Sequence, residues 1–523
     1  MKIFFALGVY SLGLVVQMGY AQNRYWICFK DKGNLPVEQA WVSEQTLANR
    51  QMLGLEIYQE TDVPLYQPYL KALQSLNIQP IFHSKWLNAV SAYLTPEQQK
   101  QAEQMPFVKE IVPITTRFLP TKMPKNLGIE YTTALMQVQA EQLKKANLAA
   151  RHVKIGIIDV GFEGAHKEMR LKHVFREQRL IQTRDFLLPN NKYFFIGETP
   201  EDDHGRDVWT LIAGYNEEEG TYFGMATKAE FYLARTDHGI LESRVEEDNW
   251  IAAVEWLDSL GVRLVNTSLG YTNGFDDKNE NYTPADMNGK TSKVSQFAQI
   301  AADQKGMILV VAAGNEGDNP KWRVVSTPGD CEGVISVGAT KHNERTKVSY
   351  SSIGPEFLDY LKPNVSCFSF NGTSFSAPII TGLIGCLLEK NPKLTQKQVR
   401  HIVEKAGHLY PYGNNYLGYG VPQAGFALEL VENINKEKHN HLYLKASGNW
   451  FVLSEMYLKQ IFKGRVIQDK DWVIFFHKRN PWSVIKQGKV KVDDGRVLIK
   501  REKHAQYTTL DANGKIIELI WLD

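Results

Sequence analysis

Residues 153–159 read Val153-Lys154-Ile155-Gly156-Ile157-Ile158-Asp159, a mostly apolar run that ends on a carboxylate. Such a short run is typical of a strand that is buried on both faces of a sheet. Four similar runs follow along the chain: Phe231–Arg235, Leu264–Ser268, Met307–Ala312 and Val334–Val337. Helical periodicity separates these runs, as in 250–259 and 292–303. Strands that alternate with helices predict an α/β fold, a doubly wound parallel sheet within residues 127–432.

The composition is that of a globular protein of several domains. A chain of 523 residues with 43% hydrophobic and 23% charged residues predicts about two to four domains. The net charge of +2 gives no reason to expect a nucleic acid or an anionic membrane as partner. The few, scattered cysteines do not suggest a disulfide scaffold or a cysteine-based zinc site, and their pairing stays open: Cys28, Cys331, Cys367 and Cys386.

The N-terminus has the parts of a secretory signal peptide. Lys2 precedes an apolar run over residues 3–16, and a small-residue cleavage site follows at Ala21. A buried helix or a membrane anchor is the alternative, but the run is shorter than the roughly 20 residues that a spanning helix needs. We therefore expect residues 1–21 to be a cleaved signal. The mature protein would be secreted or lie at the cell surface, without a membrane span.

Residues 22–115 predict a small α+β domain. Strand-like runs such as Asn88–Leu94 occur there among polar helical stretches, and Thr95-Pro96-Glu97-Gln98 is typical of a helix start. Pro120 and Pro124 follow within 116–126, which indicates a linker.

The C-terminal region, 437–523, differs from the rest in charge and in pattern. From Lys436 onward the chain holds 17 Lys and Arg against 10 Asp and Glu, whereas the preceding residues hold 43 against 48. Short alternating runs, such as Trp472–Phe476 and Arg496–Lys500, and a turn signal at Asp494-Gly495 predict a β-rich, sandwich-like module. The module weakly resembles domains used for secretion or surface attachment, and its basic charge could equally serve solubility.

Two candidate site residues lie near the start of the predicted sheet domain. Asp159 ends its strand, where open α/β sheets place their sites, although such residues are commonly turn formers. His204 and Gly205 begin a run with apolar residues at helical spacing, and the glycine permits a close backbone approach. Taken alone, His204 reads as a solvated helix cap.

Two further candidates follow. Ser374 is expected at the N-terminal end of a buried apolar helix, whose free N–H groups suit a developing oxyanion, but serine is also an ordinary N-cap. Asn315 follows the strand 307–312, and its amide can donate to an oxyanion, but an Asn-Glu-Gly turn explains it equally well.

Together these four residues make the chain resemble the subtilisin-like serine peptidases, or subtilases, in which Asp, His and Ser occur in this order. Its strongest signature is Gly372-Thr373-Ser374-x-Ser376-Ala377-Pro378. Three other runs match family motifs: His204-Gly205-x-x-Val208-x-x-x-Ile212-Ala213-Gly214, Ala312-Ala313-Gly314-Asn315 and Val265-Asn266-Thr267-Ser268-Leu269-Gly270.

The resemblance implies a secreted serine endopeptidase. Asp159, His204 and Ser374 would form the catalytic triad and Asn315 would serve the oxyanion hole. Peptide substrates would lie along a cleft lined by five residues: Ser268, Leu269, Gly270, Ala313 and Gly314. No cofactor or catalytic metal is implied, and no clear motif supports a structural calcium site.

The N-terminal domain is similar to subtilase propeptides, most clearly over Leu87–Glu97 and Pro106–Ile111. This likeness implies a zymogen whose own propeptide acts as an intramolecular inhibitor until it is cleaved. A permanent N-terminal binding domain is the alternative.

Two positions depart from the family pattern. Val160 stands where Ser or Thr is common, and Arg206 stands where Thr is usual. Neither performs proton transfer, but both leave the geometry of the cleft open. The rival hypotheses are a catalytically impaired peptide-binding protein and a surface adhesion protein. Asp202 and Asp203, just before His204, are expected to be solvated, although they would raise the pKa of His204 if they lay close to it.

Overall fold

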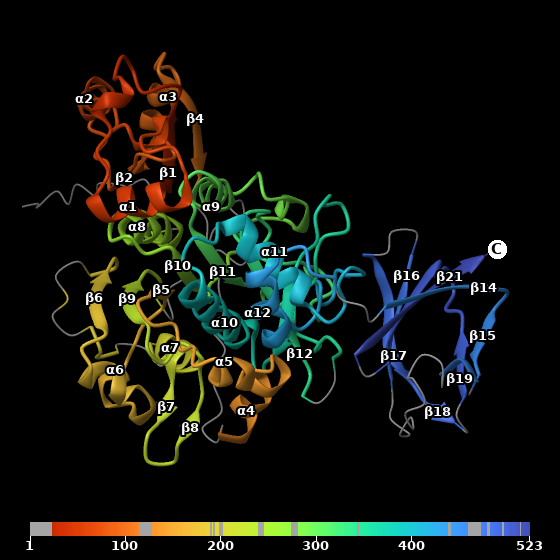
Figure 1. The fold of residues 1–523 in the computed structure, drawn as a ribbon. Helices are drawn as coiled ribbons and strands as arrows, with labels where there is room; N and C mark the ends of the chain where they lie inside the picture. The colour runs from red at the N-terminus through yellow and green to blue at the C-terminus, as the bar shows by residue number, and fades with distance from the viewer. Residues whose placement is uncertain are drawn as a thin grey trace, which may run out of the picture.

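The computed structural model describes most of the chain after residue 22. The described residues are 23–113, 128–188, 191, 194–197, 202–238, 245–272, 281–342, 345–437, 441–454, 456–458, 472–478, 482–493, 496–512 and 514–522. The predicted signal peptide (1–21) and the linker (116–126) lie outside them. Three bodies follow one another along the chain, which we call the N-terminal unit (23–113), the central unit (128–437) and the C-terminal module (441–522) (Figure 1).

A seven-stranded sheet forms the middle of the central unit. Its strands are β5 (Lys154–Asp159), β6 (Leu180–Asp185), β9 (Glu230–Arg235), β10 (Leu264–Thr267), β11 (Ile308–Ala312), β12 (Ile335–Thr340) and β13 (Val365–Phe368). The spatial order is β13-β12-β11-β10-β5-β9-β6, and all neighbouring pairs are parallel. The strand order reverses direction around β5 and β10, as a doubly wound sheet requires, so the predicted fold class is confirmed.

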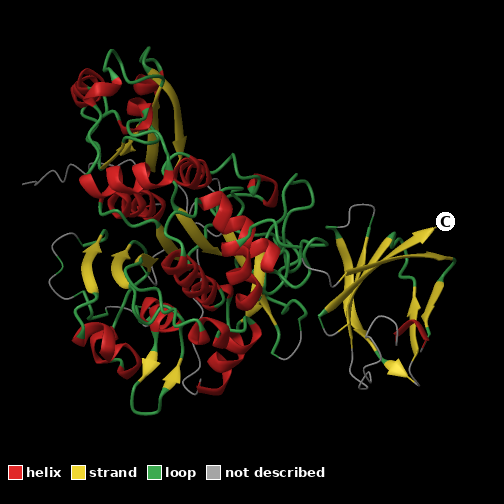
Figure 2. Ribbon diagram, in the orientation of Figure 1, coloured by secondary structure: helices red, strands yellow, loops and turns green. Residues whose placement is uncertain are grey.

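Helices cover both faces of this sheet (Figure 2). One face packs against α8 (Val245–Ser259) and α9 (Lys293–Asp303). The other face packs mainly against α7 (His204–Ala213) and α10 (Ala377–Lys390). The remaining elements of the central unit are α4 (Gly128–Gln137), α5 (Glu141–Lys145), α6 (Lys172–Arg176), α11 (Gln396–Ala406), α12 (Ala424–Glu432) and the hairpin β7 (Tyr215–Asn216) to β8 (Thr221–Tyr222). Because both faces are covered, the central strands are apolar throughout.

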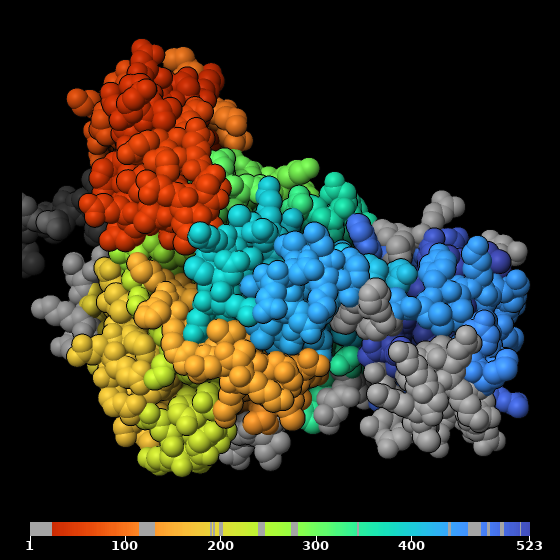
Figure 3. Space-filling view, in the orientation of Figure 1, coloured from red at the N-terminus to blue at the C-terminus, as the bar shows by residue number. Residues whose placement is uncertain are grey.

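The N-terminal unit is a four-stranded antiparallel sheet with helices. Its elements are β1 (Asn23–Phe29), α1 (Glu44–Leu53), α2 (Gln67–Ser75), β2 (Phe82–Ser84), β3 (Ala89–Leu94), α3 (Pro96–Glu103) and β4 (Val108–Pro113), with the strand order β2-β3-β1-β4. The Thr95 hydroxyl accepts from Gln98 N at 3.2 Å, which confirms the predicted start of α3. The unit sits on α8 and α9, where Trp86 stacks on Phe297 with ring centroids 5.0 Å apart (Figures 1 and 3).

The C-terminal module consists of two packed sheets around one apolar core. Its strands are β14 (His441–Ser447), β15 (Trp450–Leu453), β16 (Trp472–His477), β17 (Val484–Val490), β18 (Val492–Asp493), β19 (Arg496–Lys500), β20 (Tyr507–Ala512) and β21 (Lys515–Leu522). The sheets have the orders β14-β21-β20-β16-β17 and β15-β19-β18. The predicted β-rich module is therefore present, and it forms a separate lobe beside the central unit (Figure 3).

Two further findings concern the thiols and the membrane. All four cysteines are free and buried, and burial raises the pKa of the Cys331 thiol to about 12. Among the described residues, no helix combines the length and the apolar character that crossing a bilayer demands.

Candidate active site

Asp159 and His204 meet at the carboxyl edge of the central sheet. Asp159 is the last residue of β5 and His204 is the first residue of α7. His204 Nδ1 lies 2.7 Å from Asp159 Oδ1, and the two residues are 4% and 0% exposed. The approach requires Gly205, because a Cβ there would lie 2.4 Å from Gly161 O and 2.9 Å from Asp159 Cβ. The close approach expected at this glycine is thus confirmed.

The electrostatics of His204 favour its cation. Burial lowers the pKa of the imidazole, but the charge of Asp159 and the hydrogen bond to it act in the opposite direction, and Asp207 and Asp203 add to them. The net result is a pKa above the usual range of histidine. An imidazole in this setting gains a proton readily and is held in one orientation.

Ser374 lies in a short 3-10 helix, Thr373–Phe375, just before α10, and not within the long helix itself. Its Oγ donates to Ser268 O at 3.2 Å, and the Ser268 hydroxyl donates back to Ser374 O at 2.8 Å. The neighbouring Phe375 ring lies 5.3 Å from the His204 ring, centroid to centroid. Ser374 is therefore beside His204 and at the end of β10, and it is fully buried.

Asn315 follows β11 and faces the same corner. Its Oδ1 accepts from Thr373 N at 2.9 Å and from Thr373 Oγ1 at 3.1 Å. Because the carbonyl side of the amide is engaged in this way, its Nδ2 is the group that can donate to a ligand. The preceding Gly314 has φ +107°, and a Cβ there would lie 2.9 Å from Ser352 Oγ.

The other predicted cleft residues border these groups. Ser268, Leu269 and Gly270 run on from β10 and are buried, and Tyr271 then pairs with Thr327. Ala313 N donates to Val337 O at 3.0 Å, which continues the sheet to Ala313, and Gly314 N donates to Thr373 Oγ1 at 3.0 Å. All nine predicted site residues thus lie at one edge of the sheet.

Arg235, at the end of β9, was not predicted. Its Nε donates to Val160 O at 3.0 Å, while Nη1 and Nη2 lie 3.4 Å from Asp185 and 3.5 Å from Asp202. The arginine is 4% exposed. Its contacts join the loop that follows Asp159 to the loop that precedes His204. The sequence signal that could have identified Arg235 is a charged residue at the end of an apolar strand.

The two aspartates before His204 were expected to be solvated, and the structure differs. Asp202 is buried beside Arg235. Asp203 is partly exposed, pairs with Arg206 at 3.1 Å and raises the pKa of His204. Arg206, one of the departures from the family pattern, also pairs with Asp207 at 3.0 Å, and the other, Val160, is buried. In the part of the chain that the structure describes, no group of three His, Cys, Asp or Glu side chains could hold a metal ion.

Comparisons with known proteins agree with this arrangement. Residues 150–420 match the model described as "Subtilase family", and residues 24–126 match "Peptidase S8 propeptide domain, Bacteroidota". Subtilisin NAT of Bacillus subtilis subsp. natto is 25% identical over 356 residues, which are 64% of this chain and 80% of that protein. Subtilisin DY of Bacillus licheniformis is 27% identical over 297 residues, or 54% and 92% of the two chains.

A solved structure resembles most of the chain. It is fervidolysin from Fervidobacterium pennivorans, a keratinolytic enzyme related to subtilisin. The TM-score is 0.52 at 17% identity, over 94% of this chain and 71% of that one. This likeness shows a shared fold.

Proposed function

The chain belongs to the subtilase family and is a serine endopeptidase, and we propose that Asp159, His204 and Ser374 form its catalytic triad, with Asn315 as oxyanion donor. The observation that carries this proposal is the buried contact of 2.7 Å between His204 and Asp159, next to Ser374. It supports a reaction in which a serine hydroxyl attacks a peptide carbonyl.

In the proposed reaction His204 acts first as base. The Ser374 hydroxyl leaves Ser268 O and turns toward His204 by rotation of its side chain. As the Oγ–carbon bond forms, the hydroxyl proton passes to His204 Nε2, and Asp159 stabilises the resulting cation. The tetrahedral intermediate collapses when His204 gives this proton to the leaving amine. Water then hydrolyses the acyl-enzyme by the same two proton transfers.

Asn315 stabilises the oxyanion that develops on the substrate carbonyl. The contacts of its Oδ1 with Thr373 orient Nδ2 before substrate arrives, so little reorganisation is needed at the transition state. The Ser374 backbone N–H is the second donor. None of these steps calls on a cofactor, and we propose none.

Peptide substrates bind as an added strand beside Ser268, Leu269 and Gly270, with Ala313 and Gly314 on the other side. This segment runs on from β10, so its backbone direction suits the pairing of an extended peptide. An extended main chain is the feature that all peptide substrates share.

The chain has a propeptide domain and is made as a zymogen. We propose that residues 1–21 are a signal for secretion, 22–115 the inhibitory propeptide, 116–126 the linker, 127–432 the catalytic domain and 437–523 a β-rich module. The N-terminal unit packs through buried apolar residues against α8 and α9, which supports the inhibitory role.

The proposal is tested by expressing wild type, Ser374→Ala and a matched control, Ser259→Ala, side by side. Ser259 lies on α8 and donates to Trp256 O. We expect wild type and the control to lose the propeptide and to react with a fluorophosphonate, and Ser374→Ala to do neither. Wild-type protein that keeps its propeptide and remains unlabelled would contradict the proposal and favour a peptide-binding or adhesion protein.

A further inference from the structure

The loop that carries Asn315 is held from both sides by one segment, residues 347–354, which we call the clamp segment. Ser352 N donates to Gly314 O at 3.0 Å, and the Ser352 hydroxyl accepts from Glu316 N at 3.1 Å. One residue further on, Gly317 N donates to Tyr350 O at 2.7 Å. The position of Asn315 therefore follows that of the clamp segment.

The first end of the clamp segment is held by the C-terminal module. Lys347 N donates to Gln487 Oε1 at 2.9 Å, and Gln487 Nε2 donates to Lys347 O at 2.9 Å. Gln487 lies on β17, so one side chain of the module satisfies both backbone groups of this residue. A paired amide of this kind fixes direction as well as distance.

The second end is held by the module through Asn415 of the central unit. Gly354 N donates to Asn415 O at 2.9 Å. The same Asn415 receives a hydrogen bond from Val484 N at its Oδ1, at 3.0 Å, and donates its backbone N–H to Trp482 O at 2.8 Å. Val484 and Trp482 both belong to the C-terminal module. Asn415 therefore connects the module to Gly354, the last residue of the clamp segment.

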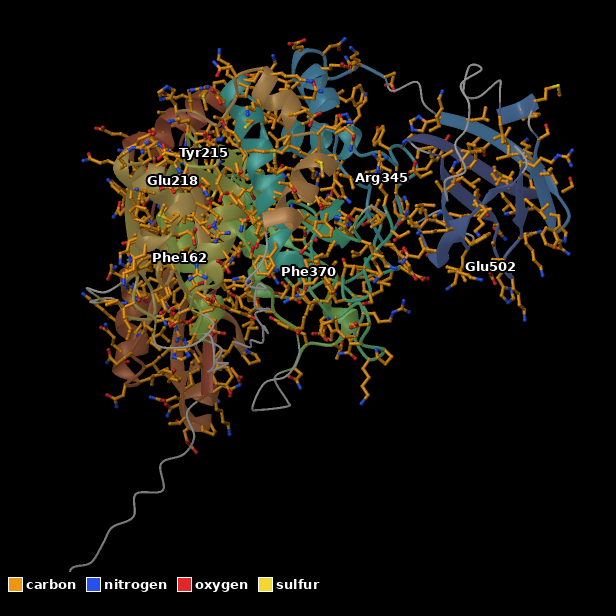
Figure 4. The ribbon with its side chains drawn as sticks, turned by 90° about the horizontal axis from the view of Figure 1, so that it is seen from below. Phe162, Tyr215, Glu218, Arg345, Phe370 and Glu502 are labelled. Carbon is orange, nitrogen blue, oxygen red and sulfur yellow. The ribbon has the colours of Figure 1, made fainter. Side chains whose placement is uncertain are left out.

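Apolar packing and charge complete this junction. Ile353 of the clamp segment belongs to a buried cluster with Leu409, Tyr416 and Leu417 of the central unit and four module residues: Val473, Phe475, Val484 and Ile516. Arg345 lies 3.5 Å from Asp511 of the module, at the boundary between the two bodies in Figure 4. A buried apolar cluster shared by the two bodies thus holds the module against the central unit, unlike a domain that is joined only by a linker.

We propose that the C-terminal module is a positioning element of the oxyanion site, with Gln487 of the module and Asn415 of the central unit as the positioning residues. The inference rests on the proposed role of Asn315. The module holds both ends of the clamp segment, whose middle holds the residues on either side of Asn315. Oxyanion stabilisation depends on donors that are fixed before the reaction, so a displacement of about 1 Å can cost up to about 10²-fold in rate.

The primary test is Gln487→Ala in the full-length protein, with Lys486→Ala as the matched control. Lys486 is the neighbour of Gln487 on β17, but it is exposed and its Nζ pairs with the half-buried Glu502 at 2.6 Å. The variants are measured after self-processing, and intact mass confirms that each still carries the C-terminal module. We expect Gln487→Ala to lower kcat about tenfold with little change in KM. We expect Lys486→Ala to match wild type. An equal kcat for the two variants, or release of the module without loss of kcat, would overturn the proposal.

A double-mutant cycle with Asn315→Ala separates positioning from a general loss of stability. If Gln487 acts through Asn315, adding Gln487→Ala to Asn315→Ala lowers kcat by no more than about twofold, because the misplaced donor is already absent. Full additivity of the two effects would overturn the inference and leave the proposed function intact. Wild-type kcat in Asn315→Ala itself would instead contradict the proposed oxyanion role, and the inference with it.

Discussion

The imidazole Nδ1 of His204 lies 2.7 Å from Oδ1 of Asp159, although 45 positions separate the residues in sequence. The carboxyl end of β5 and the start of α7 meet because Gly205 lacks a side chain. With Nδ1–H donating to the carboxylate, Nε2 is the basic atom of the ring, on the side available to Ser374. The pair thus sets both the orientation and the basicity of the imidazole.

A pH profile tests this pair. The proposed reaction needs neutral His204, so we expect kcat/KM to fall as the pH decreases through the pKa of His204. Because Asp159 raises that pKa, we expect the acid limb of wild type to have its midpoint above about 6.5. Asp159→Asn removes the charge, so the midpoint moves to lower pH, and we expect kcat to fall about 10⁴-fold because the imidazole loses the partner that fixes its tautomer.

The matched control for this profile is Glu502→Gln, which removes a carboxylate of the C-terminal module. It is expected to leave the acid limb unchanged. An acid limb that does not move in Asp159→Asn would show that His204 is not the base.

Substitution of Asn315 tests the oxyanion donor. We expect Asn315→Ala to lower kcat by about 10²–10³-fold with KM nearly unchanged, since the donor acts mainly on the transition state. Asn315→Asp keeps an acceptor for Thr373 but cannot donate, so it should lose at least as much. The exposed Asn435→Ala serves as control, and a KM effect without a kcat effect would point to substrate binding instead.

The sequence predicted five of the seven strands of the central sheet because these five are apolar and buried. β6 was missed because it is an edge strand with polar, partly exposed residues, and β13, the strand at the opposite edge, was missed although its four residues are buried. Apolar periodicity reports burial on both faces, and it weakens where a strand has solvent beside it. The two-sheet C-terminal module was predicted from its alternating runs, but its docking on the central unit has no local signal.

The motifs predicted which side chains meet at the site, but not what holds them there. Arg235 bonds to Val160 O and lies near Asp185 and Asp202, three partners that are distant in sequence. The sequence predicted a solvated Asp202, because the burial of Asp202 depends on its contact with Arg235. Such contacts arise from the tertiary arrangement and leave no spacing pattern in the chain.

Gly205→Ala tests the close approach beneath the triad. The added Cβ would overlap Gly161 O and press on Asp159, so we expect a loss of about 1–3 kcal/mol in the free energy of unfolding and a lower kcat. Thermal denaturation and steady-state kinetics measure the two effects. Gly425→Ala is the control, because its Cβ would meet only the flexible side chains of Gln142 at 3.3 Å and Gln139 at 3.7 Å, and alanine favours the helix. Equal behaviour of the two variants would contradict the steric argument.

The contacts between the N-terminal unit and α8 predict that the affinity of the two units for each other falls as the pH rises. Glu255 of α8 accepts from the Ser84 hydroxyl at 2.7 Å and from Trp86 N at 3.4 Å. Burial, opposed by the bond from Ser84 and by the charges of Lys85 and Lys305, raises the pKa of Glu255 to about 7. The complex therefore takes up a proton that the separated, solvated Glu255 would not hold.

The sign of the effect follows from this proton. Affinity between the N-terminal unit and the central unit is highest below the ordinary pKa of a glutamate and falls as the pH rises to about 7, by up to about tenfold per pH unit for one carboxyl. Burial also raises the pKa of Asp258 to about 6, so Asp258 acts in the same direction. Co-elution of the cleaved N-terminal unit with the enzyme, measured from about pH 5 to pH 8, gives the profile. Glu255→Gln keeps an acceptor for Ser84 but cannot titrate, so its profile should be flatter than that of wild type, and an equally steep profile would exclude Glu255 as a source of the pH dependence.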